Sequence, residues 1–178
     1  AYVEANRLFA ERVAGLGDGM VWVHDYQLIR VGAELRARDP KRVIAFFLHI
    51  PFPPADSFFK LPWRDEILTA LLAYDLVGFQ TERDRTAFLD CVSRVAPDAT
   101  VRHLGGGRLA ELTHQGRRVR GGAFPIGIDA TRVAARAKSS AVNRRLKELR
   151  RELGDRDVVL GVDRLDYTKG IPERLAAF

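Results

Sequence analysis

Three short apolar runs, each followed by polar residues, constrain the fold of this chain most strongly. The runs are GMVWVHD at 19–25, RVIAFFLHI at 42–50 and YDLVGFQT at 74–81. Apolar runs of this length are typical of strands that are buried on both faces of a parallel sheet. Helical stretches accompany them at 28–38, 62–73 and 82–96. This alternation predicts an open α/β sheet, Rossmann-like, with right-handed crossovers.

The pattern weakens after Pro97 and then starts again. GGG at 105–107 and HQGRR at 114–118 predict turns between short strands. The glycine triplet has no helix after it, which favours a hairpin turn over a phosphate-binding loop. Further along the chain we expect a strand at 124–128, a long helix at 131–153, a strand at 157–166 and a helix that opens with Pro172. We therefore predict two domains, 1–135 and 136–178, of which the second is truncated.

Length and hydropathy limit the class of protein. The chain has 178 residues, enough for one full core or for one domain and the beginning of another. It contains no run of about 18 apolar residues, so we predict no membrane span. AYVEANRLFAERVAG at 1–15 predicts an amphipathic helix and not a signal peptide. Because the chain begins without Met, inside this helix, we expect an internal fragment of a cytoplasmic protein.

Charge and cysteine content narrow the chemistry. The formal net charge is +6, which suits an enzyme with phosphorylated substrates. The densest basic run, RRLKELRREL at 144–153, has leucines at helical spacing, which favours a solvated helix face over a nucleic-acid site. The single cysteine, Cys91, excludes an internal disulfide framework. Its apolar neighbours favour a buried small hydrophobe over a nucleophile.

Polar residues follow the predicted strands, at the sheet edge where open α/β proteins bind ligands. Asp25 follows the first strand, where a carboxylate can accept hydrogen bonds from sugar hydroxyls, act as a base or cap the next turn. His49 follows the second strand, although a lone histidine in this position is more often a buried, hydrogen-bonded one. In the HIPFPP stretch at 49–54, the prolines predict a stiff, extended turn beside a ligand.

RLDYTKG at 164–170 combines two cations across one loop. Arg164 offers a planar fork of donors, Lys169 offers a mobile point charge, and Gly170 lets the backbone come close. Together they suit a diphosphate at the start of a helix. The alternative is a surface ion pair of Arg164 with Asp163 or Asp166, which is worth about 0–1 kcal/mol.

Other chemistries have less support. Asp155 and Asp157 form a D-x-D pattern in a short loop, which favours a surface turn over a metal site. The chain has no G-x-S-x-G elbow, no G-x4-G-K-[ST] loop and no H-x-E zinc pattern. No metal site is predicted.

Six motifs in register resemble one family. They are HDYQL (24–28), FFLHIPFP (46–53), LPWRDEIL (61–68), YDLVGFQTERDRTAFLDCV (74–92), FPIGID (124–129) and RLDYTKGIPERL (164–175). The chain resembles the trehalose-6-phosphate synthases, retaining glycosyltransferases of family 20 with the GT-B fold. The resemblance covers most of the chain and is weakest at 97–120. One departure is Gln27, where some members have His.

The resemblance implies two Rossmann-like domains with the active site in the cleft between them. This chain would supply the later part of the acceptor domain and the start of the donor domain. Asp25 would bind the acceptor, glucose 6-phosphate. His49 and Ile50 would line the sugar pocket and influence which anomer is taken, and Arg164 and Lys169 would hold the diphosphate of UDP-glucose. None of these residues is assigned as a general base.

The implied reaction transfers glucose from UDP-glucose to glucose 6-phosphate, with retention and without a metal or other cofactor. The products are α,α-trehalose 6-phosphate and UDP. The implied partners are these small molecules alone, without nucleic acid or membrane, and a homo-oligomer is compatible with the resemblance. Other parts of the cleft lie outside the 178 residues, so we expect this chain alone to be inactive.

Two alternatives remain open within the same fold. A glucosylglycerol-phosphate synthase would keep the donor site and take glycerol 3-phosphate as acceptor. A non-catalytic sugar-phosphate sensor would keep the fold, although the charged residues Asp25, Arg164 and Lys169 argue against it. The sequence does not distinguish UDP from GDP or ADP as the donor nucleotide, since all would use Arg164 and Lys169 alike.

Overall fold

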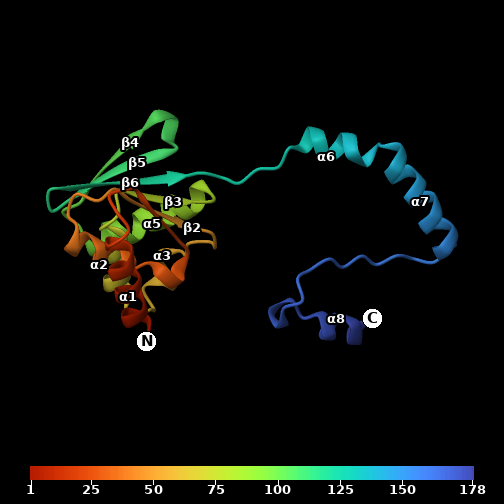
Figure 1. The fold of residues 1–178 in the computed structure, drawn as a ribbon, viewed down its shortest axis with the longest axis horizontal. Helices are drawn as coiled ribbons and strands as arrows, with labels where there is room; N and C mark the ends of the chain where they lie inside the picture. The colour runs from red at the N-terminus through yellow and green to blue at the C-terminus, as the bar shows by residue number, and fades with distance from the viewer. The chain divides into compact units, whose positions relative to one another are not determined.

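A six-stranded mixed sheet organises the first part of the chain (Figure 1). The computed structural model describes residues 1–105 and 107–178 in full and divides into two compact units, Ala1–Gly127 and Ile128–Phe178. The sheet order is β1-β2-β3-β6-β5-β4. The strands are β1 (Val21–His24), β2 (Ile44–Leu48), β3 (Leu76–Phe79), β4 (Thr100–Leu104), β5 (Leu109–His114) and β6 (Arg117–Ala123).

The first three strands form the parallel sheet that the apolar runs predict. β1 pairs with β2 in register Val21↔Ile44, and β2 pairs with β3 in register Ala45↔Leu76. β6 continues the parallel part beside β3, while β5 and β4 add antiparallel strands. The predicted α/β class is thus confirmed, and the three predicted strands form at the predicted places.

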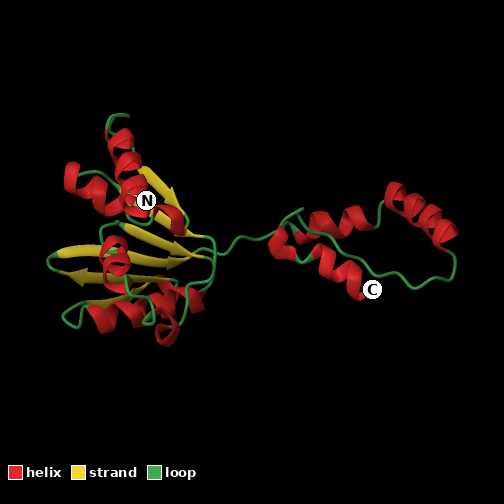
Figure 2. Cartoon of the chain, turned by 90° about the horizontal axis from the view of Figure 1, so that it is seen from below, coloured by secondary structure: helices red, strands yellow, loops and turns green.

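The helices of the first unit lie on one side of this sheet (Figures 1 and 2). They are α1 (Tyr2–Ala14), α2 (Val31–Arg38), α3 (Ala55–Phe58), α4 (Arg64–Leu71) and α5 (Glu82–Val95), with a short 3₁₀ turn η1 (Tyr26–Leu28). The expected helices at 28–38, 62–73 and 82–96 correspond to α2, α4 and α5. None of the helices within the described residues has the length and apolar composition of a membrane span.

The core lies between the sheet and these helices. The ring of Phe46 lies 5.2 Å from that of Tyr74, and the ring of Phe79 lies 5.2 Å from that of Phe88 in α5, where Cys91 and Val92 are also fully buried. This confirms the predicted burial of the cysteine. Burial raises the pKa of the Cys91 thiol to about 11, which keeps it protonated and unreactive.

The face of β1 that points away from the core is exposed to solvent, so the prediction that this strand is buried on both faces is wrong. We expected the first strand to be buried on both faces, but the Trp22 side chain is 58% exposed and His24 is also exposed. β1 is an edge strand of the sheet, and it contributes the buried Val23 and the partly buried Val21 to the core. The second strand, in contrast, is buried along its whole length.

The two turns predicted after residue 97 are confirmed. The glycine triplet forms a 3₁₀ turn, η2 (Gly105–Gly107), between the antiparallel strands β4 and β5. Gln115 and Gly116 connect β5 to β6 and both have positive φ, at 49° and 75°. Two successive residues with positive φ are typical of a tight two-residue hairpin loop.

Residues 124–128 do not form the strand that we expected. The strand comes just before them, in β6, and the ring of Phe124 folds back over the sheet. A Cβ atom at Gly122 would lie 2.4 Å from this ring and one at Gly78 would lie 3.3 Å from it, so both positions need glycine. Pro125 then lacks the amide that a strand would use.

The second unit corrects two further predictions. The expected helix at 131–153 is two helices, α6 (Ala130–Ala137) and α7 (Ser140–Leu153). The side chain of Ser139 accepts a hydrogen bond from Val142 N at 3.4 Å and so starts α7 as its N-cap. Residues 157–166 are extended but form no strand, because no backbone ladder joins them to another segment of the described chain. The helix predicted to open with Pro172 is confirmed as α8 (Ile171–Ala177).

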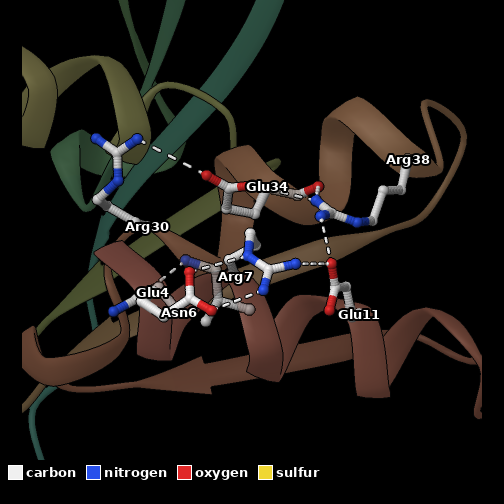
Figure 3. A network of polar contacts seen from close by, with 8 residues as sticks. Glu4, Asn6, Arg7, Glu11, Arg30, Glu34 and Arg38 are labelled. Atoms are coloured by element: carbon white, nitrogen blue, oxygen red, sulfur yellow. Dashed lines mark hydrogen bonds and ion pairs between the residues drawn. The ribbon is translucent and has the colours of Figure 1, made fainter. Parts of the chain in front are cut away.

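Polar contacts on the surface of α1 and α2 include one ion pair that joins the two helices (Figure 3). Arg38 reaches Glu34 at 3.1 Å and Glu11 at 3.2 Å, and Arg7 pairs with Glu4 and Glu11. The mostly exposed pairs of this network contribute little to stability.

Buried hydrogen bonds of Asn6 connect α1 to η1 and to the start of α2. It is fully buried, and its amide nitrogen donates to the carbonyl oxygens of Tyr2 and Gln27, at 2.9 Å each. Its oxygen accepts a hydrogen bond from Val31 N at 3.1 Å. Asn6 therefore fixes the segment that follows Asp25.

Candidate active site

Asp25 follows β1 directly and has an unusual backbone conformation. Its φ and ψ are 67° and 163°, a region that residues other than glycine rarely adopt. Its amide donates to the carbonyl of Phe47 at 2.9 Å, and its Oδ1 accepts a hydrogen bond from His49 N at 2.9 Å. These contacts connect the ends of β1 and β2. The Asp25 carboxylate accepts no hydrogen bond from the amides of η1. It therefore does not cap the next turn, which was one of the three roles considered from the sequence.

His49 lies next to Asp25 on the same edge of the sheet. Its side chain is exposed, so the expectation of a buried histidine is wrong. Its Nε2 atom lies 2.8 Å from Nδ1 of His24, and the two rings are stacked with centroids 5.1 Å apart. His24 is a neighbour of Asp25 in HDYQL, but the sequence carried no signal that the two histidines meet. Only the parallel register of β1 and β2 brings them together.

Asp84 supports the HIPFPP turn and was not expected from the sequence. Its Oδ1 accepts a hydrogen bond from Phe52 N at 3.2 Å, and its Oδ2 accepts one from the Thr81 hydroxyl at 2.7 Å. Thr81 in turn caps α5 by accepting from Asp84 N. The T-x-x-D pattern at 81–84 resembles a capping box, which is the signal that could have identified this contact.

Ile50 faces a different hollow from Asp25 and His49. It is 45% exposed and lines an apolar cavity of about 680 Å³ in the first unit. Among its other lining residues are Tyr26, Leu48, Pro51 and Trp63, whereas Asp25 and His49 are not among them. The structure thus brings Asp25 and His49 together and places Ile50 on the wall of the neighbouring cavity.

Arg164 and Lys169 belong to the second unit, in an exposed loop. The Arg164 side chain is 83% exposed, and its only described ion pair, with Asp166, has a long N–O distance of 3.9 Å. Asp166 accepts hydrogen bonds from the amide and hydroxyl of Thr168, at 3.0 and 2.9 Å, and starts the 3₁₀ turn η3 (Tyr167–Lys169). The Thr168 amide above all keeps the pKa of the Asp166 carboxyl below its usual value.

The RLDYTKG loop therefore keeps its two cations exposed. Gly170 has the left-handed conformation, with φ at 56°, and begins α8. Asp163 pairs with Arg174 at 2.7 Å instead of with Arg164. Of the two surface ion pairs considered for Arg164, only the one with Asp166 is present, and its N–O distance of 3.9 Å makes it weak.

Comparison with known proteins shows the family to which the chain belongs. The model of the family described as "Glycosyltransferase family 20" matches residues 1–178. A trehalose-6-phosphate synthase of Sinorhizobium fredii is 45% identical over 180 residues, covering 99% of this chain and 37% of the relative. A trehalose-6-phosphate synthase of Mycobacterium avium is 50% identical over 183 residues, with the same coverage.

Solved structures give the same result. An α,α-trehalose-phosphate synthase (UDP-forming) from Burkholderia xenovorans in complex with glucose 6-phosphate has a TM-score of 0.77 and is 36% identical. An E. coli protein titled "Trehalose-6-phosphate", bound with UDP-2-fluoro glucose, has a TM-score of 0.75 and is 40% identical. Each likeness covers 99% of this chain and 38% of the other.

The likeness to these structures identifies the mixed sheet of the first unit as part of a GT-B-type fold. The chain belongs to glycosyltransferase family 20. It spans somewhat more than a third of the length of the curated relatives that it matches.

Proposed function

We propose that this chain is part of a trehalose-6-phosphate synthase, which transfers glucose from UDP-glucose to glucose 6-phosphate. The observation that supports this most is the contact between Asp25 and His49 at the strand ends, in a chain 36% identical to an enzyme solved with glucose 6-phosphate. The relatives from S. fredii and M. avium are also trehalose-6-phosphate synthases. The proposed division of labour places the acceptor residues in the first domain and the diphosphate residues in the second.

In this proposal Asp25 binds the acceptor. Its Oδ1 already accepts the His49 amide, so its other carboxylate oxygen is the one that accepts a hydrogen bond from a glucose 6-phosphate hydroxyl. His49 forms a wall near the sugar beside Asp25, and Ile50 would reach the sugar from the neighbouring apolar cavity. The strained backbone of Asp25 fits this role, because such conformations cluster at ligand-binding positions.

Arg164 and Lys169 act on the donor. Both are exposed and have no strong partner among the described residues, so they are available to bind the diphosphate of UDP-glucose. As the bond from glucose C1 to the diphosphate oxygen breaks, negative charge develops on UDP, and the two cations stabilise it. The C1 hydroxyl of the acceptor attacks from the same face and gives its proton to the departing phosphate. The proposal includes no metal ion, and it places the enzyme in the cytoplasm.

The test measures UDP release by the full-length protein with UDP-glucose. Release with glucose 6-phosphate and not with glycerol 3-phosphate is the expected result. Arg164→Ala and Lys169→Ala should each lower kcat/KM by about 10²–10³, the usual effect of removing a group that stabilises transition-state charge. Lys147→Ala is the matched control, because Lys147 is an exposed cation on α7 outside the RLDYTKG loop.

Two other results would change the assignment. Release with glycerol 3-phosphate alone would identify a glucosylglycerol-phosphate synthase and leave the diphosphate residues in place. Tight UDP binding without release from either acceptor would identify a sugar-phosphate sensor.

A further inference from the structure

His24 and His49 meet because β1 and β2 are parallel and in register. His24 is the last residue of β1 and lies beside Phe47 of β2. His49 follows β2 by one residue, and its side chain lies on the same face as those of His24 and Phe47. The Nδ1 atom of His24 and the Nε2 atom of His49 are 2.8 Å apart, a hydrogen-bond distance.

This contact links the protonation patterns of the two rings. A neutral imidazole carries hydrogen on one nitrogen only. If His24 donates from Nδ1, then Nε2 of His49 accepts and the hydrogen of His49 is on its Nδ1. If His49 donates from Nε2 instead, its Nδ1 is an acceptor. In either case the bond to His24 determines what the outer nitrogen of His49 offers to a ligand.

Neighbouring aromatic rings and the backbone fix the position of both imidazoles. The Trp22 ring lies 4.6 Å from the His24 ring, and the Phe47 ring lies 4.8 Å from the His49 ring, measured between centroids. Asp25 holds the amide of His49. Three contacts therefore hold His49: Asp25 binds its backbone amide, Phe47 packs on its ring, and His24 contacts its Nε2 atom. Among the described residues, its Nδ1 has no hydrogen-bond partner and remains available to a ligand.

We propose that His24 is a positioning residue, which holds the His49 ring and selects its tautomer for the sugar substrate. This inference rests on the proposed function, because it assumes that His49 contacts a transferred or accepting glucose. His24 acts only through His49. Its own effect should therefore appear in the orientation of the sugar and so in kcat more than in KM.

The experiment uses two variants of the full-length protein and one control. His24→Phe keeps an aromatic ring beside Trp22 but removes the hydrogen bond. His24→Asn restores a polar atom on Cγ, the carbon that carries Nδ1, and it can donate or accept. His103→Phe is the matched control, since His103 is an exposed histidine of β4 outside the site. The readouts are UDP release with UDP-glucose and glucose 6-phosphate, the melting midpoint, and the ¹⁵N chemical shifts of the His49 ring.

The expected result is a loss of kcat of about tenfold for His24→Phe, which is the size of one positioning hydrogen bond. The His49 shifts should change in the same variant while its melting midpoint stays near that of the wild type. His24→Asn should recover most of the activity, and His103→Phe should match the wild type.

Three results would overturn the inference. Wild-type kcat in His24→Phe, with unchanged His49 shifts, would show that His24 does not position His49. Equal losses in the Phe and Asn variants would show that the hydrogen bond is not the reason for the effect. In both cases the wild type is active, so the proposed function survives. A wild type that releases no UDP would instead refute the proposed function, and the inference with it.

Discussion

Replacing Asn6 with Ala should destabilise the fold through one buried amide. Asn6 is fully buried and accepts a hydrogen bond from Val31 N, which is itself buried at the start of α2. Without Asn6 this N–H group has no partner. An unsatisfied buried group costs about 1–3 kcal/mol. The other main partner, the Gln27 carbonyl, belongs to an exposed residue and can be hydrated, so it adds little.

The expected change in melting temperature follows from this cost. A loss of about 2 kcal/mol in a domain of this size lowers the melting midpoint by about 3–5 °C per kcal/mol, or about 6–10 °C in all. Differential scanning calorimetry of the full-length protein measures it on the transition of the first domain. The effect should extend to function, because Asn6 anchors the segment after Asp25.

The control is the only other asparagine of the chain. Asn143 lies on the exposed surface of α7 and donates one hydrogen bond, to the Lys138 carbonyl at 3.1 Å. Alanine has the higher helix propensity at both positions, so that gain cancels in the comparison. Asn143→Ala should shift the midpoint by no more than about 2 °C, as surface substitutions usually do. If both variants melt at the same temperature, the buried amide is not what stabilises this region.

Three further predictions follow from single contacts. Gly32→Ala should prevent normal packing of α2, because its Cβ atom would lie 2.4 Å from the buried Tyr74 ring. Urea denaturation should therefore show a lower midpoint, and an unchanged midpoint would contradict this. Asp84→Ala should cost about 1–3 kcal/mol, since Phe52 N loses its partner, and should raise limited proteolysis within HIPFPP; resistance equal to the wild type would disprove it. Cys91 should react with iodoacetamide at pH 8 only after denaturation, because burial raises its pKa to about 11 and leaves little thiolate; modification of the folded protein at the rate of a free thiol would refute this.

Much of the fold could be predicted because it depends on local pattern. The runs around Val23, Phe46 and Val77 are apolar and short, and helical stretches separate them, so the positions of these three strands followed from the chain. The carboxyl-edge rule then identified Asp25 and His49 as neighbours, and the structure brings them into direct contact. The roles of Asp25, His49, Ile50, Arg164 and Lys169 stay predictions, as does the boundary between domains 1–135 and 136–178.

Two of the failed predictions of secondary structure concern segments that depend on partners far away in sequence, and the third has a local cause. Residues 157–166 have the composition of a strand, but a strand needs a neighbour to share its backbone hydrogen bonds. The strand expected at 124–128 lies earlier in the chain, in β6. It ends before Phe124, because the Phe124 ring packs on Gly122 and on Gly78 of β3. The helix at 131–153 divided at Ser139, where a local cap was more favourable than helix continuation.

The sequence alone determined the class of fold and the positions of its first three strands, since hydrophobic periodicity carries that information. Only the tertiary structure decided which side chains meet at the carboxyl edge of the sheet. Strand register placed Nδ1 of His24 against Nε2 of His49, and the left-handed backbone of Asp25 turned its carboxylate to the His49 amide. Such contacts depend on distances of a few tenths of an ångström between residues 24 or more positions apart, which no local pattern specifies.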